Sequence, residues 1–321
     1  MIAMPQPASA VLERDVMQRL ALSWDDRVAV RKPRLPLDQY YDPRIPDFPI
    51  ALIPFCRDPA FQQELDGAAD AARLRYLAAT WIAYNERVIF IEDDIVQPLC
   101  GLLRRGVLPG VDEALLQRII AQVQVDEQFH TLMCLEVCQS ARNRHALHDY
   151  RLPEPLLGKR LRDRLARVRE AGGTRQDEAL MRLAYATISE ATIHDYLKAL
   201  SSDTSIQPLN RAHTDLHRRD ETAHGAIFLQ LARSVYLHLN DGAQARLREH
   251  LNHALADSVE IDLGFWASTL PYLRDRDWSP FLTHVESALA GRQVGRDYTG
   301  LLVLLDELGI RDRLAFAFPR P

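Results

Sequence analysis

Apolar residues recur at helical spacing along most of this chain, and the interruptions of that pattern separate successive helices. Residues 9–22 form a short amphipathic stretch. The prolines between residues 33 and 54 then exclude regular helix, so this segment is expected to wrap over the helices as extended chain. Asp58-Pro59 has the composition of a helix start, and Thr174 is a second capping residue. The main helical regions are predicted at about 58–105, 112–147, 156–170, 174–200 and 208–239, and shorter ones near 242–258, 279–290 and 300–308.

The pattern contains no convincing strand, low-complexity tract or solenoid repeat, so it predicts an all-α protein. A chain of 321 residues can bury its core as one large domain. We expect a single domain made of an N-terminal arm (1–57), a helical core (58–240) and a C-terminal helical extension (241–321).

Composition narrows the functional classes. The chain is 47% hydrophobic and 26% charged, which is typical of an ordinary globular protein. Its net charge of -5 argues against nucleic acid as a partner. The first ten residues do not resemble a signal peptide, and no apolar run has the length of a membrane span, so a cytoplasmic location is expected. The cysteines show no metal-binding spacing and are expected to be reduced: Cys56, Cys100, Cys134 and Cys138.

Two copies of one short motif carry the candidate chemistry. Both have two acidic residues followed, three positions after the second, by histidine: Asp126-Glu127-Gln128-Phe129-His130 and Asp220-Glu221-Thr222-Ala223-His224. On a helix, the glutamate and histidine of each motif lie about 60° apart, so each pair can bind one metal. Two such helices facing two helices that each give one glutamate form the site of ferritin-like di-iron proteins. The preceding Asp126 and Asp220 suit acceptors for the hydrogen bond of a ligand imidazole.

The other candidate ligands follow from helical neighbours. His217 lies one turn before Glu221 and adds a third imidazole on the same helix face. Glu190 lies on a largely apolar helix, where a buried carboxylate needs a partner such as a metal or a cation. Glu92 and Glu86 both project from apolar surroundings, and periodicity alone does not choose between them.

These motifs resemble those of the AurF-like p-aminobenzoate N-oxygenases. That family's order of ligands matches Glu92, Glu127-x-x-His130, Glu190 and His217-x-x-x-Glu221-x-x-His224. The resemblance covers residues 80–225 and extends over the whole chain. It implies a ferritin-like four-helix core with additional N- and C-terminal helices. It also implies two iron ions bridged by Glu127 and Glu221, with Glu92 and His130 on one ion and Glu190, His217 and His224 on the other.

The resemblance further implies an enzyme that uses O2 to oxidise an amine to a hydroxylamine, nitroso or nitro product. The substrate would be an arylamine or an amino-acid amine, free or tethered to an acidic carrier protein. An external electron donor and a homodimer are also expected. Tyr84 and Arg296 match the positions of substrate contacts, with Arg296 facing a substrate carboxylate; a surface position for Arg296, between Gly295 and Asp297, is the alternative.

Two rival functions remain open. A di-iron enzyme that hydroxylates or desaturates carbon would keep these ligands but usually has two histidines, so His217 speaks against it. A ferritin-like iron-handling protein would be smaller and lack the terminal extensions. The helix predicted at 156–170 is basic, and it is either a solvated face or a docking face for an acidic carrier: Lys159, Arg160, Arg162, Arg164, Arg167 and Arg169.

Overall fold

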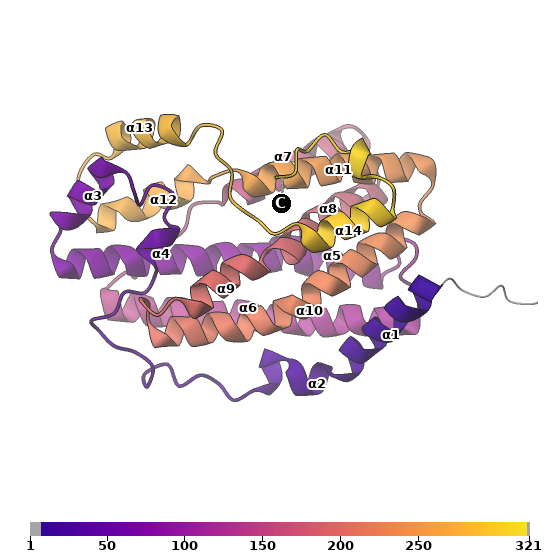
Figure 1. Cartoon of the computed structure of the whole chain (residues 1–321), viewed down its shortest axis with the longest axis horizontal. Helices are drawn as coiled ribbons and strands as arrows, with labels where there is room; N and C mark the ends of the chain where they lie inside the picture. Colours follow the sequence, from indigo (N-terminus) through magenta and orange to yellow (C-terminus); the bar gives the residue numbers. More distant parts are fainter. Residues whose placement is uncertain (1–7, 320–321) are drawn as a thin grey trace, which may run out of the picture.

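The computed structural model describes residues 8–319, and every regular element within that range is helical (Figure 1). Four long helices form the core: α4 (Asp70–Ile91), α6 (Ala114–His145), α8 (Arg175–Thr192) and α10 (Pro208–His238). α4 packs on α6, α8 packs on α10, and α6 also contacts α10. The prediction of an all-α, ferritin-like bundle with added terminal helices is therefore confirmed.

The remaining helices surround this bundle. Those before and within the core are α1 (Ala8–Leu22), α2 (Trp24–Arg27), α3 (Pro59–Asp66), α5 (Gln97–Arg104), α7 (Leu156–Glu170) and α9 (His194–Ser202). Those that follow the core are α11 (Asp241–Val259), α12 (Leu263–Thr269), α13 (Ser279–Leu289) and α14 (Thr299–Glu307). Short 3₁₀ turns occupy Ala29–Arg31, Ile50–Leu52, Leu270–Tyr272 and Arg311–Arg313.

Local capping signals set several helix starts as predicted. The Asp58 carboxylate accepts hydrogen bonds from the backbone N–H groups of Ala60, at 2.9 Å, and Phe61, at 3.3 Å. Thr174 and Asp177 form a reciprocal capping box at the start of α8. Both satisfy N–H groups that a helix start leaves without an intrahelical partner.

The structure divides two helical regions that were predicted to be continuous. The region at 58–105 breaks at Gly67, which ends α3, and later contains a π-helical turn over Glu92–Val96. The region at 174–200 changes direction at Ile193, between α8 and α9. α12 was missed because it is only seven residues long, although Asp262 caps it by accepting from the Phe265 N–H at 3.0 Å.

The N-terminal arm runs along the outer side of the bundle. α1 contacts both α6 and α10, and α2 leads into the 3₁₀ turn that also contacts them (Figure 1). Between Val28 and Asp58 there is no α-helix, as the prolines predicted. Phe48, Ile53 and Phe55 from this segment are buried, so their apolar side chains anchor it to the bundle.

Two hydrophobic clusters fill the protein, and the polar site lies where they meet. On α6, Ile120 and Val123 belong to one cluster and Cys134 and Val137 to the other. The buried cluster residues of α8 and α10 belong to the first cluster, and those of α4 belong to the second. The bundle therefore surrounds a polar centre with apolar packing at both ends.

Among the helices described within residues 8–319, none combines the length and the apolar composition that a membrane span requires.

Candidate metal centre

The four core segments bring all seven predicted ligands into one cluster. Each side chain is at most 4% exposed, so the cluster is almost dry. Glu92 comes from the π-helical turn after α4, Glu127 and His130 from α6, Glu190 from α8, and three residues from α10: His217, Glu221 and His224. Three overlapping groups of these residues have ligand atoms within 4.8 Å of one another.

Glu221 lies at the centre of the imidazoles. Its Oε1 is 3.0 Å from His217 Nε2, 3.3 Å from His130 Nδ1 and 3.4 Å from His224 Nδ1. Glu127 reaches two of them, with Oε2 3.0 Å from His130 Nδ1 and Oε1 3.0 Å from His224 Nδ1. Both carboxylates therefore stand between imidazoles, as bridging ligands do.

His217 lies close to Glu92, His130 and Glu221. His217 Nε2 lies 3.7 Å from Glu92 Oε1, and its ring centroid is 4.1 Å from that of His130. It groups with Glu92, His130 and Glu221, whereas no group contains it together with Glu190 or His224. His217 and His224 lie one turn on opposite sides of Glu221, and the imidazoles of both approach Glu221 Oε1.

The residues fit a pair of metal ions. Three buried carboxylate oxygens of the cluster have no hydrogen-bond partner among the described residues: Glu92 Oε2, Glu190 Oε2 and Glu221 Oε2. Buried polar atoms without partners are costly, and cations would satisfy all of these at once. Carboxylate and imidazole ligands are the set expected for iron rather than for a thiolate-preferring metal.

Without metal, the four carboxyl groups divide into two kinds. Burial and the neighbouring carboxylates raise the pKa of Glu92 and of Glu190 well above the ordinary glutamate value. Burial also opposes ionisation of Glu127 and Glu221, but the adjacent imidazoles, His224 first, lower the pKa of both. Mutual repulsion in a dry site opposes the ionisation of all four carboxyl groups together. Metal binding would therefore displace protons from the cluster.

Local chain geometry places two of the ligands. Glu92 begins the π-helical turn, whose extra residue shifts the register of the chain between α4 and α5. Gly225 follows His224, and a Cβ there would lie 3.1 Å from the Glu190 carbonyl oxygen. The missing side chain lets α10 approach α8 closely enough for Glu190 to join the cluster.

Glu86, the alternative to Glu92, lies elsewhere. Its carboxylate pairs with Arg142 and accepts a hydrogen bond from the Leu152 N–H at 2.7 Å. His213 and His194, which the family pattern leaves without a metal role, are also outside the cluster. His213 Nε2 contacts Asn85 Oδ1 at 3.1 Å, and His194 Nδ1 contacts Thr222 Oγ1 at 3.2 Å.

Each aspartate of the repeated motif contacts a histidine on the opposite helix. Asp126 on α6 lies 3.2 Å from Nε2 of His224 on α10, while Asp220 on α10 lies 3.2 Å from Nε2 of His130 on α6. Both aspartates are 1% exposed. Each holds the imidazole of the opposite helix, so Nδ1 of both histidines faces the cluster.

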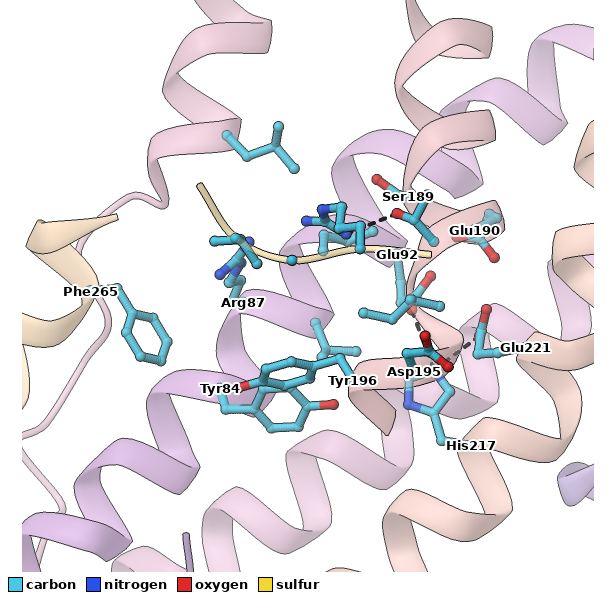
Figure 2. Close-up of a pocket in the computed structure, with 18 of the residues that line it drawn as sticks. Tyr84, Arg87, Glu92, Ser189, Glu190, Asp195, Tyr196, His217, Glu221 and Phe265 are labelled. Carbon is cyan, nitrogen blue, oxygen red and sulfur yellow. Dashed lines mark hydrogen bonds and ion pairs between the residues drawn. The ribbon is translucent and has the colours of Figure 1, made fainter. Parts of the chain in front are cut away.

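A cavity opens onto one side of the cluster. Figure 2 shows Glu190, Glu221 and His217 at one end of this view and Arg87 and Phe265 toward the other. The Tyr84 and Tyr196 rings, with centroids 5.6 Å apart, form part of its wall between these ends. Both predicted substrate residues, Tyr84 and Arg296, line this cavity. The alternative of a surface Arg296 is not what the structure has.

Two guanidinium groups line the cavity without a carboxylate partner among the described residues. Arg296 donates only to neutral acceptors, Thr192 Oγ1 at 2.9 Å and the Ser258 carbonyl at 2.8 and 3.1 Å. Burial, with a smaller effect from Arg87, lowers the pKa of Arg296 to about 10, so it stays charged at neutral pH. Arg87 has no ion pair or hydrogen bond within residues 8–319. Together they favour an anionic group in the cavity.

Some residues of the site were not found from the sequence. Arg87 could have been, because it follows Tyr84 by three positions and so shares its helix face. Trp24 could not have been found from the sequence. Its indole N–H donates to both oxygens of Asp126, at 3.0 and 2.9 Å, and the two residues are 102 positions apart in the sequence. No local pattern signals such a contact.

The basic helix α7 is largely neutralised within the chain. Arg160 pairs with Glu260 at 3.0 Å, Arg164 with Asp257 at 2.9 Å and Arg169 with Glu178 at 2.8 Å. Arg162 pairs with Glu154. These pairs favour a role for the cations in joining α7 to its neighbours over the docking of an acidic carrier.

Comparison with known proteins agrees with this site. A family model described as P-aminobenzoate N-oxygenase AurF matches residues 12–309. A 4-aminobenzoate N-oxygenase from Streptomyces thioluteus is 33% identical over 305 residues, which cover 94% of this chain and 88% of that protein. The match includes the whole helical core and most of the C-terminal extension. The chain is therefore an oxygenase that belongs to the p-aminobenzoate N-oxygenase AurF family.

Proposed function

We propose that this protein is a di-iron N-oxygenase that oxidises the amine of a free arylamine carboxylic acid with O2. One arrangement carries the proposal. Buried imidazoles and carboxylate oxygens without hydrogen-bond partners converge at one end of a cavity, and two guanidinium groups without carboxylate partners line the same cavity. An arylamine acid has matching ends, an amine and a carboxylate separated by a flat ring.

The seven residues of the cluster would hold the irons. Glu127 and Glu221 would be shared by the two ions, because each lies between the imidazoles of His130 and His224. The other ligands of the two ions would be Glu92, His130, Glu190, His217 and His224. When bound, the irons would supply the electrons and the activation of O2. The chain supplies ligand geometry, charge balance and a site from which bulk water is excluded.

The cavity would orient the substrate. Arg296 and Arg87 would bind the carboxylate through charge-assisted hydrogen bonds. The aromatic ring would lie against Tyr84, Tyr196 and Phe265, which leaves the amine directed toward the cluster. A substrate tethered to a carrier through its carboxyl group has no free carboxylate for these cations. The cavity therefore favours the free acid over the tethered one.

The two rival functions fit these residues less well. A carbon-hydroxylating or desaturating enzyme would use the same carboxylates but has no evident need for His217 within the cluster. Iron storage would need no cavity with aromatic walls and unpaired cations. Both rivals make different products, so the assay that follows separates them from N-oxygenation.

The deciding experiment is an assay of iron-loaded, reduced protein with 4-aminobenzoate and isotopically labelled O2. We expect mass spectrometry to find labelled oxygen on the amine nitrogen of the product. 4-Methylbenzoate is the matched control, because it keeps the carboxylate and offers only C–H bonds. Hydroxylation of that methyl group, with 4-aminobenzoate unchanged, would establish carbon chemistry instead. Accumulation of a ferric core without either product would establish iron storage.

Replacing His217 by alanine is expected to leave both metals bound, since six ligands remain and Glu127 and Glu221 are among them. Product formation should fall at least about tenfold, about 1.4 kcal/mol in the barrier, because one iron loses a neutral nitrogen ligand. His238→Ala removes an exposed histidine from the same helix and is the control. Parent-like turnover of His217→Ala with full iron content would contradict a functional role for His217.

A further inference from the structure

The N-terminal arm reaches the cluster through the two aspartates that hold its histidines. Trp24 donates to both oxygens of Asp126, at 3.0 and 2.9 Å. Five residues later, the Ala29 backbone N–H donates to Asp220, at 3.0 and 3.3 Å. Arg27 lies between them, with Nη1 3.6 Å from Asp220 Oδ1. One short segment thus contacts the outer partner of an imidazole on each of two helices.

We propose that residues Trp24–Ala29 are a positioning clamp for the metal centre, in which Trp24 and the Ala29 N–H fix the imidazoles of His224 and His130 through Asp126 and Asp220. This inference rests on the metal centre of the proposed function. It assigns a role to the arm that the ligand motifs do not contain.

The contacts form two parallel chains of hydrogen bonds. One runs from the Trp24 indole to Asp126 and on to His224 Nε2, which lies 3.2 Å from the carboxylate. The other runs from the Ala29 N–H to Asp220 and on to His130 Nε2, also at 3.2 Å. Each chain ends on an imidazole whose Nδ1 faces Glu127 and Glu221.

These chains set both the direction and the tautomer of the ligands. A carboxylate that accepts from Nε2–H leaves the Nδ1 lone pair free for a metal. The carboxylate can hold that position only if its own orientation is fixed. Trp24 does so through two contacts with a rigid indole. Among the described residues, Arg27 is the only arginine or lysine paired with Asp220, so it also offsets the charge of a carboxylate that is 1% exposed.

The arrangement also joins the two helices that carry the histidines. Asp126 belongs to α6 and Asp220 to α10, and the clamp binds both from outside the bundle. Its position along these helices follows from α1, which packs on both of them. Loss of a clamp contact should therefore loosen one imidazole while the bundle stays folded.

Trp24→Phe tests the clamp, because phenylalanine keeps the aromatic packing and lacks the indole N–H. Metal-free full-length protein is titrated with Co²⁺ against a chelator, and the visible Co²⁺ spectrum is recorded. We expect affinity for one of the two ions to fall about three- to tenfold, less than the 10- to 100-fold typical of a direct outer partner. The spectrum of that ion should shift. Trp278→Phe is the control, since the Trp278 indole donates at 3.0 Å to the Arg274 carbonyl, outside the cluster.

A cycle with Asp126→Ala shows whether Trp24 acts through the carboxylate. If it does, Trp24→Phe has no further effect on Co²⁺ affinity once Asp126 is absent. Additive losses, equal losses in Trp24→Phe and Trp278→Phe, or an unchanged spectrum and affinity in Trp24→Phe would each overturn the clamp. Failure of the parent protein to bind two ions would instead overturn the proposed metal centre.

Discussion

Glu221→Ala is expected to abolish the metal centre and with it product formation. The Glu221 carboxylate is the one that approaches all three histidines of the cluster, at 3.0 to 3.4 Å. Its removal would take a bridging ligand from both ions and leave three imidazoles without their common anion. We expect metal affinity to fall by more than about 100-fold, beyond the loss typical of an outer partner. Elemental analysis after iron-replete expression should find two irons per chain in the parent and almost none in the variant.

The matched control is Glu86→Ala, which removes a glutamate from the same bundle. Glu86 pairs with Arg142 rather than with the cluster, so this variant should keep both irons while losing some stability. Equal iron in the parent and in Glu221→Ala would refute the bridging role. Iron loss in Glu86→Ala but not in Glu221→Ala would place the centre elsewhere in the chain.

Arg296→Met is expected to raise the KM for 4-aminobenzoate about 100-fold, which corresponds to about 2.7 kcal/mol. That is within the range for truncating one partner of a buried, hydrogen-bonded charge pair. Methionine keeps the apolar stem of the side chain and removes the guanidinium. The loss should appear in KM more than in kcat, because the carboxylate lies away from the reacting nitrogen. Steady-state kinetics with the free acid measures both.

A neutral substrate separates recognition from packing. Arg296 also holds Thr192 and the Ser258 carbonyl, so its loss can disturb the segment before α14. If Arg296 binds the carboxylate, 4-aminobenzamide should be oxidised equally by the parent and Arg296→Met. Arg292→Met, at an exposed position four residues earlier, should behave as the parent with both substrates. Equal losses with acid and amide would limit Arg296 to a structural role.

The sequence determined what depends on spacing along one helix. Glu127 and His130 are three positions apart on α6, and Glu221 and His224 repeat this on α10. Helical geometry alone places each pair on one face, whatever the helix packs against. The helix starts at Asp58 and Thr174 were predictable for the same reason, since a cap acts on N–H groups two or three residues away. Local patterns therefore gave the helices and most candidate ligands.

Only the tertiary structure decided what depends on contacts between helices. In the folded protein the Glu92 carboxylate lies in the cluster and the Glu86 carboxylate pairs with Arg142. Periodicity alone had not shown which of the two glutamates is the candidate ligand. The packing of the helices also brings the His217 imidazole close to Glu92 and places the Arg296 side chain in the wall of the cavity. Each outcome depends on how one helix is rotated and displaced against another, and the hydrophobic pattern specifies the buried face without specifying its neighbour.

The contacts of the arm are the clearest case. Asp126 holds a histidine 98 positions later and is itself held by a tryptophan 102 positions earlier. Neither partner is marked by composition, spacing or charge. The sequence fixes which side chains can donate and accept, but three separate helices must pack before these atoms come within hydrogen-bond distance. Most candidate ligands were therefore predictable from local geometry, while the network that orients them follows from packing.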